Sequence, residues 1–160
     1  MMRDRTNLAN QRSFGLDPGL GNVLFDLWLA SRAVHALIDD ALRPAGLDAD
    51  EFAIYSLLAS SDPTTPTELA RWMAAPATTV SSYIKRFEKR GHVELVTNPD
   101  DGRSRLVKLT TAGRRAHQHA GDLFRPILAE VEQEVGADEE QTHGQLQALH
   151  QIIDTMRHQT

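Results

Sequence analysis

The sequence predicts a mainly α-helical protein with a small β-hairpin wing, that is, a winged helix-turn-helix with flanking dimerisation helices. Two observations predict this fold class. Two short helical segments are followed directly by two alternating strands, and long helical stripes of apolar residues lie on either side of that unit. We therefore expect an N-terminal arm at residues 1–17, a helical dimerisation region made of 18–44 and 113–160, and a winged helix-turn-helix domain at 45–112.

Composition limits the classes of protein that need to be considered. The chain has 160 residues, of which 41% are hydrophobic, and it has no cysteine. The missing cysteines exclude disulfides, thiolate metal ligands and thiol redox sensing. No apolar run approaches the roughly 18 residues of a membrane span, and residues 1–14 lack the apolar core of a signal peptide. We expect a cytoplasmic protein that does not enter a membrane.

The first two helices are indicated by apolar periodicity and by a capping pair. An apolar stripe at helical spacing runs from Leu20 to Ala41 and stops at the helix-breaking segment 43–46, whose sequence is RPAG. Asp48 and Glu51 have the spacing of a capping box, in which Asp48 is the N-cap of a second helix.

The next two helices begin with a specific signal and end at a glycine. Thr65, Pro66 and Glu68 supply an N-cap, a first-turn proline and a reciprocal carboxylate. A fourth helix follows Pro76 and ends at Gly91, because a left-handed glycine commonly stops a helix there. Two short helices joined by a tight turn predict a helix-turn-helix.

The hairpin and two more helices complete the order. The turn-forming sequence NPDDG at residues 98–102 separates strands at 92–97 and 105–109 and predicts a β-hairpin. A threonine at position 110 or 111 is expected to cap a long helix, in which Pro126 predicts a kink. Asp138, three residues before a glutamine, predicts the cap of the last helix.

Charge is distributed unevenly along the chain. The formal net charge is −5, yet residues 62–119 hold ten basic and six acidic residues, a local charge of +4 against −9 for the remainder. A basic segment inside an acidic chain indicates an anionic partner for that segment. Chance clustering on a solvated surface would give the same totals. Only the position of the basic residues in the fold can distinguish an anionic partner from chance.

The fourth predicted helix separates into an apolar and a polar face. On a helical wheel, Ile84 and Phe87 fall within about 40° of Val80, and all three are expected to face the core. Short hydroxyls allow a helix to approach base edges in a major groove, and basic side chains further along neutralise phosphates. The polar face has that order, and its residues are our candidate DNA contacts: Thr78, Thr79, Ser81, Ser82, Lys85, Arg86 and Lys89.

The hairpin carries two further candidate DNA contacts, Arg103 and Arg105. Arg103 lies at the predicted tip, where a guanidinium can enter the negative potential of a minor groove. Arg105 lies nearer the base of the return strand. We expect Arg105 either to contact a phosphate or to pair with Asp100 or Asp101 and stiffen the turn.

Four runs of sequence within Thr67–Gly113, namely ELA, TTVSSYIKRFEKRG, DDGRSR and LTTAG, resemble the MarR family of bacterial winged helix-turn-helix transcription regulators. With the helix order included, the resemblance extends over about residues 20–158. It implies a homodimer with interlocked terminal helices that binds a palindromic operator through one recognition helix and one wing per subunit. It also implies phenolic or similar ligands. Two departures are Gly102, where the family often has an arginine, and Pro76, where many members have a capping serine.

A candidate effector site combines aromatic and polar residues. Trp28, Arg32 and His35 share one side of the first helix, and Tyr55 and Trp72 are expected to approach them from neighbouring helices. An apolar cleft with a few polar groups suits a small aromatic anion. The alternative is that Trp28 and Tyr55 are core or interface residues.

The remaining sequence features indicate no catalysis. Of the seven histidines, His143 and His150 have a spacing that places two on one helix face, but no cysteine or carboxylate motif accompanies them. No HExxH, P-loop, GxGxxG or GxSxG sequence is present. We expect neither an enzyme nor a cofactor nor a bound metal.

The sequence therefore predicts a homodimeric repressor that binds double-stranded DNA and is released by a small aromatic or phenolic effector. The alternative is a winged-helix protein-interaction module without specific DNA binding. The basic residues on the fourth helix and the wing arginine favour DNA.

Overall fold

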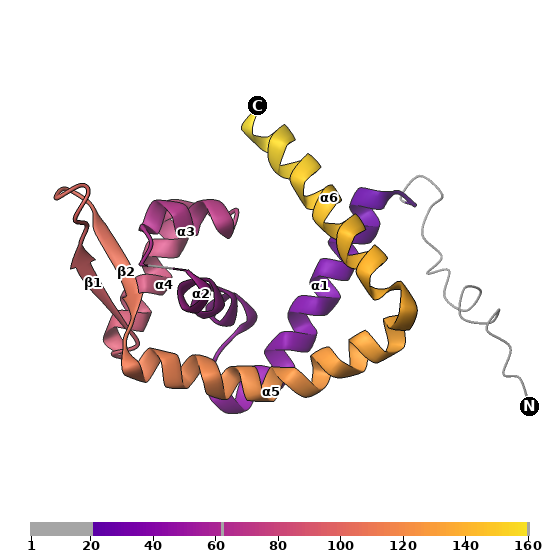
Figure 1. Cartoon of the computed structure of the whole chain (residues 1–160), viewed down its shortest axis with the longest axis horizontal. Helices are drawn as coiled ribbons and strands as arrows, with labels where there is room; N and C mark the ends of the chain where they lie inside the picture. The colour runs from indigo at the N-terminus through magenta and orange to yellow at the C-terminus, as the bar shows by residue number, and fades with distance from the viewer. Residues whose placement is uncertain (1–20, 62, 160) are drawn as a thin grey trace, which may run out of the picture.

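A computed structural model describes residues 21–61 and 63–159 and confirms the predicted fold class (Figure 1). The predicted arm at residues 1–17 lies outside the described residues. The elements follow in the order α1 (Val23–Leu42), the 3-10 helix η3 (Arg43–Ala45), α2 (Ala49–Ser60), α3 (Pro66–Trp72), α4 (Ala77–Lys89), β1 (Val93–Thr97), β2 (Arg105–Leu109), α5 (Thr111–Val135), the 3-10 helix η4 (Gly136–Asp138) and α6 (Glu139–His158).

Both predicted capping boxes are confirmed. The Asp48 carboxylate accepts a hydrogen bond from the Glu51 backbone N–H at 2.7 Å, and the Asp48 N–H donates to Glu51 Oε2 at 3.4 Å. Thr65 and Glu68 make the same reciprocal pair at the start of α3. Helix α1 is capped by Asn22, a residue that the sequence analysis did not identify. Local hydrogen bonding therefore sets where these helices begin.

Asp138 occupies the predicted N-cap position of α6, but the predicted capping by its side chain is wrong. Asp138 ends η4 with φ −92° and ψ 5°, and its side chain makes no capping hydrogen bond. A capping carboxylate needs an extended backbone to reach the N–H groups of the first turn, and the 3-10 helix holds Asp138 away from that conformation. Helix α5 continues through Pro126 without interruption, and its ribbon curves along its length (Figure 1).

The core of the winged-helix lobe is built around α4. Val80, Ile84 and Phe87 are buried, as the helical wheel predicts. The Phe87 ring packs edge-on against Tyr55 of α2, with 4.6 Å between the ring centroids. The other buried members come from every neighbouring element of the lobe and from the flanking helices α1 and α5: Leu42, Leu47, Ile54, Leu58, Leu69, Val93, Val107, Leu109 and Ala120.

The wing is a two-stranded antiparallel hairpin with an additional anchor. Val93 pairs with Leu109 and Leu95 pairs with Val107, so the apolar members of both strands share the face toward the core. Thr64, just before α3, forms an isolated bridge with Val107, whose N–H donates to the Thr64 carbonyl at 2.7 Å. The base of the wing is therefore bonded to the start of the helix-turn-helix, which the sequence did not predict.

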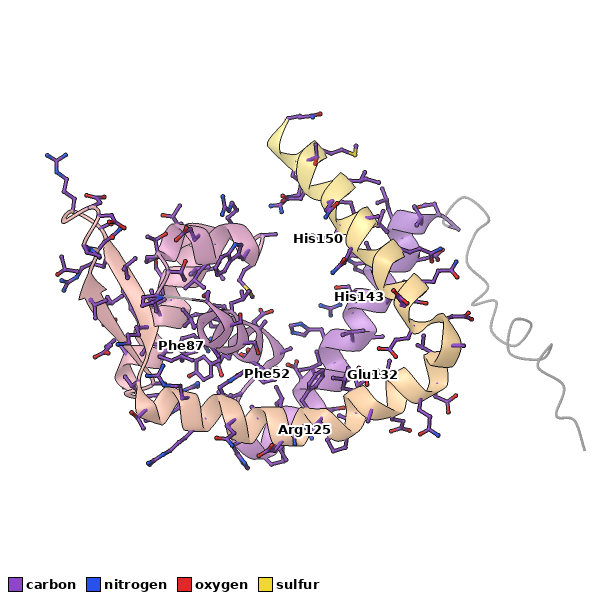
Figure 2. All side chains as sticks on the ribbon, viewed as in Figure 1. Phe52, Phe87, Arg125, Glu132, His143 and His150 are labelled. Carbon is purple, nitrogen blue, oxygen red and sulfur yellow. The ribbon has the colours of Figure 1, made fainter. Side chains whose placement is uncertain are left out.

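Helix α5 connects two ends of the molecule. The hairpin lies at its beginning, whereas α6 and the outer part of α1 lie at its far end (Figure 1). Large exposed apolar side chains gather on these three flanking helices: Val23, Leu24, Trp28, Val34 and Leu37 of α1, Leu128 and Val131 of α5, and Leu146, Ile152 and Met156 of α6. Acidic residues also gather at the far end, namely Glu130, Glu132, Glu134, Asp138, Glu139 and Glu140, and Figure 2 shows Glu132 there.

A close backbone approach joins the lobe to the first turn of α5. The Thr110 N–H donates to the His92 carbonyl at 3.0 Å, which brings that carbonyl against Gly113. A Cβ atom on Gly113 would lie 2.0 Å from the His92 oxygen. Position 113 therefore requires glycine because of contact with backbone, which cannot move aside as a flexible side chain can.

We predict that Gly113→Ala lowers the free energy of unfolding by about 2 kcal/mol or more, because the added methyl group overpacks this junction. Gly121→Ala in the same helix is the matched control, since none of the described residues beyond its neighbours in the helix has an atom within 4 Å of its Cβ position. That change should instead stabilise α5 by about 0.5–1 kcal/mol. Urea unfolding followed by circular dichroism measures both, and a Gly113→Ala protein as stable as the wild type would contradict the close approach.

Candidate nucleic-acid interface

The exposed face of α4 presents the residues predicted for it. Burial of the apolar stripe turns the opposite side outward, and all seven α4 candidates are exposed: Thr78, Thr79, Ser81, Ser82, Lys85, Arg86 and Lys89. The helix begins after Pro76 without a side-chain cap. The Ser82 hydroxyl donates to the Thr78 carbonyl at 2.9 Å, which leaves its oxygen lone pairs as acceptors.

The tip of the wing is ordered by its own polar groups. The Asp101 carboxylate accepts from the Arg103 backbone N–H at 3.0 Å, and the Asp101 carbonyl accepts from the Ser104 N–H at 2.9 Å. The Asn98 side-chain amide donates to the Ser104 hydroxyl at 2.8 Å. These bonds hold the turn, and Arg103 is exposed at its end.

Arg105 does not pair with either turn aspartate among the described residues. Its guanidinium donates to the Thr97 hydroxyl at 3.3 Å. Thr97 is its partner in the strand register, so the two side chains lie next to each other on one face of the hairpin. Of the two alternatives given for Arg105, pairing with a turn aspartate is therefore replaced by a cross-strand contact, and contact with a phosphate stays a prediction.

A groove of about 620 Å³ lies between α3, α4 and the wing. Ser81 and Lys85 line it from α4, and Arg105 lines it from β2. Thr65 and Thr67 add hydroxyls from the start of α3, and Asn98 and Ser104 add polar groups from the turn. The structure thus brings three of the predicted contact residues, from two separate elements, onto one concave surface.

Arg86 differs from the other basic residues of α4. Its guanidinium carbon lies 4.5 Å from the centre of the Tyr83 ring, and its Nη2 lies 3.4 Å from Glu51 Oε1. Arg90 reaches the other oxygen of the same carboxylate at 3.0 Å, and this hydrogen bond raises the pKa of Arg90. Glu51 is 2% exposed, so both arginines serve a buried anion.

Contacts made by Tyr83, Asp50 and Glu51 hold α4 in place, a role that the sequence analysis did not predict for any of the three. Tyr83 had no assigned role, yet its hydroxyl donates to Asp50 at 2.9 Å. Burial, together with that bond, raises the pKa of Tyr83 to about 12, so it remains a donor. Glu51 was identified only as a cap partner. A carboxylate at the third position of a helix signals a cap from local spacing, whereas its contacts with a distant helix leave no local signal.

The five predicted effector residues lie in different surroundings. Tyr55 is fully buried in the lobe and hydrogen-bonds His92 Nδ1 at 2.9 Å. Trp28 is 56% exposed and stacks on Phe25. His35 lies near Asp39 and Asp50, and Arg32 is exposed on the same helix. Tyr55 is thus a core residue, which was the alternative interpretation.

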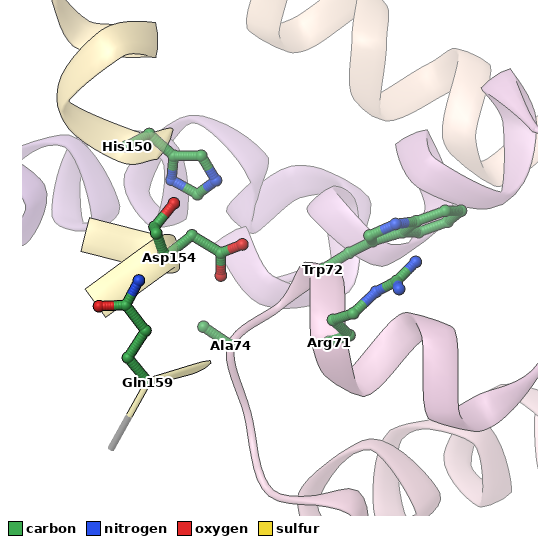
Figure 3. A pocket seen from close by; sticks show the side chains of 7 residues that line it. Arg71, Trp72, Ala74, His150, Asp154 and Gln159 are labelled. Atoms are coloured by element: carbon green, nitrogen blue, oxygen red, sulfur yellow. The ribbon is translucent and has the colours of Figure 1, made fainter. Parts of the chain in front are cut away.

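Trp72 lines a different cleft, of about 550 Å³, between α3 and α6 (Figure 3). Arg71 and Trp72 lie on one side of this cleft, and His150, Asp154 and Gln159 lie on the other. Its floor includes Ala74, which has φ 50° and whose carbonyl faces Arg157 at 3.5 Å. The cleft therefore lies between the helix-turn-helix and the last helix.

Two of the histidines on the long helices have polar side-chain partners. His143 lies 2.8 Å from the Gln147 amide, and His117 Nε2 lies 3.1 Å from the Ser56 hydroxyl. Burial lowers the pKa of His117. Within the described ranges, no three His, Cys, Asp or Glu side chains gather as a metal site would require. Over the same part of the chain, no helix has both the length and the apolar character needed to cross a membrane.

Comparison with known proteins gives consistent similarities. The sequence profile described as the MarR family matches residues 45–104. The transcriptional activatory protein BadR of Rhodopseudomonas palustris is 29% identical over 143 residues, which are 84% of this chain and 78% of BadR. The multiple antibiotic resistance protein MarR of Escherichia coli is 29% identical over 107 residues, which are 64% of this chain and 72% of that protein.

A solved structure extends the similarity to the whole fold. The transcriptional regulator MosR of Mycobacterium tuberculosis, crystallised in complex with DNA, superposes with a TM-score of 0.72 and 27% identity. The match covers 85% of this chain and 98% of MosR. The similarity therefore includes the flanking helices as well as the winged-helix lobe.

Proposed function

The chain belongs to the MarR family of winged helix-turn-helix transcription regulators, and from that premise we propose that it is a homodimeric repressor of a palindromic operator. The observation that carries the proposal is the concave surface between α4 and the wing, where Ser81, Lys85 and Arg105 meet. A major groove accepts an α-helix of this kind, and the exposed wing tip extends toward the neighbouring minor groove. Binding to chromosomal DNA would place the protein in the cytoplasm.

Exposed apolar surface supports the dimer. A groove of about 480 Å³ between α1 and α5 is lined by Leu37, Ile127, Val131 and Val135. With the exposed apolar residues of α6, it forms a surface of the kind that obligate partners cover. A two-fold dimer presents two recognition helices to half-sites about one helical turn apart, roughly 34–36 Å.

Repression is the proposed sign of regulation, because a dimer seated on a promoter excludes polymerase. BadR carries the name of an activatory protein, so the sign is to be measured with a reporter gene under the selected operator. Lower expression in the presence of the protein is the expected result.

We further propose that a small aromatic anion controls the protein from the cleft between α3 and α6. Trp72 offers a ring for stacking, Arg71 offers a cation for a carboxylate, and His150 and Gln159 offer hydrogen bonds from the opposite wall (Figure 3). The volume of about 550 Å³ suits a bicyclic aromatic acid. An occupant would fix the distance between α6 and the helix-turn-helix, and thereby select a spacing that does not match DNA.

The first prediction concerns DNA recognition. Selection of duplexes from a random-sequence pool with the wild-type protein should yield a palindrome. Arg103→Ala should then weaken binding to that operator at least tenfold in anisotropy at physiological salt, because a minor-groove contact is worth about 1–3 kcal/mol and the dimer loses two. Lys85→Ala should weaken operator and random DNA alike and flatten the salt dependence.

Arg125→Ala is the matched control for these substitutions. Arg125 is an exposed arginine on α5 that pairs with Asp122, away from the wing and α4 (Figure 2). Its loss should leave operator affinity unchanged. A pool that yields no enriched sequence would favour the alternative function, a protein-interaction module.

The second prediction concerns assembly. Analytical ultracentrifugation at micromolar concentration should give twice the 17.8 kDa mass of the chain. Val131→Glu places a charge in the apolar groove between α1 and α5 and should shift the protein toward monomer. Gln133→Glu adds the same charge on the other side of α5 and should leave the dimer intact. A wild-type monomer would contradict the proposal.

The third prediction concerns the effector. With 2-naphthoate as the probe, operator affinity should fall for the wild type and for Trp28→Phe, but not for Trp72→Leu or Arg71→Gln. Cyclohexanecarboxylate, an anion that cannot stack, and 2-naphthol, which carries no carboxylate, should act more weakly. Loss of the response in Trp28→Phe alone would instead locate the site on α1, where the sequence analysis placed it.

A further inference from the structure

Two consecutive carboxylates at the start of α2 face a single stripe of α4. Asp50 accepts a hydrogen bond from the Tyr83 hydroxyl at 2.9 Å. Glu51 accepts from Arg90 at 3.0 Å and lies 3.4 Å from Arg86. Positions 83, 86 and 90 are three and four residues apart, so they lie on one side of the helix. The first turn of α2 therefore contacts α4 along two of its turns.

Because Glu51 is buried, its carboxylate depends on these contacts for charge compensation. It is the one charged side chain among the described residues that is buried, and a buried carboxylate requires cationic or hydrogen-bonding partners. Oε2 has the Arg90 hydrogen bond, whereas Oε1 has no hydrogen bond among the described groups and has Arg86 as its cation. Loss of Arg86 would leave a buried anionic oxygen without compensation.

Arg86 is also engaged through its flat face. The guanidinium lies over the Tyr83 ring at 4.5 Å, while its edge faces Glu51. The Tyr83 hydroxyl is in turn bonded to Asp50. Tyr83 and Arg86 thus form a small assembly in which each holds the other against α2. Lys85, the adjacent residue, lines the groove beside the wing instead.

We propose that Arg86 is a positioning residue rather than a DNA contact, and that Asp50 and Glu51, acting through Tyr83 and Arg86, set the angle at which α4 enters the major groove. The inference rests on the proposed operator binding. Base-edge contacts from the start of α4 are short and directional, so a small rotation of the helix disrupts them. Phosphate contacts by flexible lysines tolerate the same rotation. The carboxylates therefore govern specificity more than overall affinity for DNA.

The first turn of α2, through Asp50 and the Ala49 N–H, is also in contact with α1. His35 Nδ1 lies 3.9 Å from Asp50, and Asp39 accepts a hydrogen bond from the Ala49 N–H at 2.7 Å. The first turn of α2 is thus held between a flanking helix and the recognition helix. A displacement of α1 would reach α4 through the residues that orient it.

Anisotropy with the pool-selected operator and with a random duplex of equal length, across a range of salt, tests the proposal. Tyr83→Phe removes one hydroxyl, and Arg86→Lys retains the charge but loses the planar stack. Each should weaken operator binding by about fivefold or more, because Tyr83→Phe loses a hydrogen bond to a charged group and Arg86→Lys loses the stacked guanidinium that faces Glu51. Affinity for random DNA and the salt slope should not change. Lys85→Ala is the comparison, because there both affinities and the slope should fall.

Two outcomes would overturn the proposal. If Arg86→Lys binds like the wild type while Arg86→Gln loses affinity for both duplexes and flattens the salt slope, Arg86 contacts phosphate. If Tyr83→Phe and Arg86→Lys both keep wild-type discrimination, the carboxylates do not orient α4. Thermal melts check that the variants fold, and the single-hydroxyl change in Tyr83→Phe remains informative if Arg86→Lys or Arg86→Gln does not fold. A wild type that selects no operator would remove the proposed function itself, which is a different result.

Discussion

Burial of one apolar stripe on α4 determines most of what the winged-helix lobe exposes. Val80, Ile84 and Phe87 insert between α2, α3 and the wing, and Phe87 is closed over by Tyr55. A helix satisfies such a contact at one rotation about its axis, so its hydroxyls and lysines have to face outward. The wing then takes its place because its inward residues pack on the same stripe. The candidate interface is therefore a consequence of the core.

The structure shows which features the sequence can predict. Helix order, the two capping boxes and the polar face of α4 depend on neighbours within a few residues, and all three are confirmed. The Thr64 bridge to the wing and the cross-strand partner of Arg105 depend on how separate segments meet. Asp138 shows a local failure, because a 3-10 helix replaces the extended backbone that a cap needs.

In the candidate site too, features set by neighbouring residues could be predicted, whereas features set by contacts between separate segments could not. Helical periodicity predicts that Lys85 and Arg86 are both exposed, and both are. It cannot distinguish a basic residue open to a ligand from one held by a carboxylate on another helix, as Glu51 holds Arg86. The predicted effector residues show the difficulty more strongly. Tyr55 and Trp72 are both aromatic residues of amphipathic helices, yet one lies in the core and the other lines a cleft.

The separation of charge along α5 has a consequence for how the protein meets a polyanion. The acidic residues at the far end and the basic residues on α4 and the wing give the subunit an electric dipole. In the field of a DNA duplex that dipole experiences a torque, so the lobe is turned toward the phosphates before contact and the acidic end is turned away. Side-on encounters become rare, and an acidic protein can still associate rapidly with DNA. Added salt would shorten the range of this orientation and slow association.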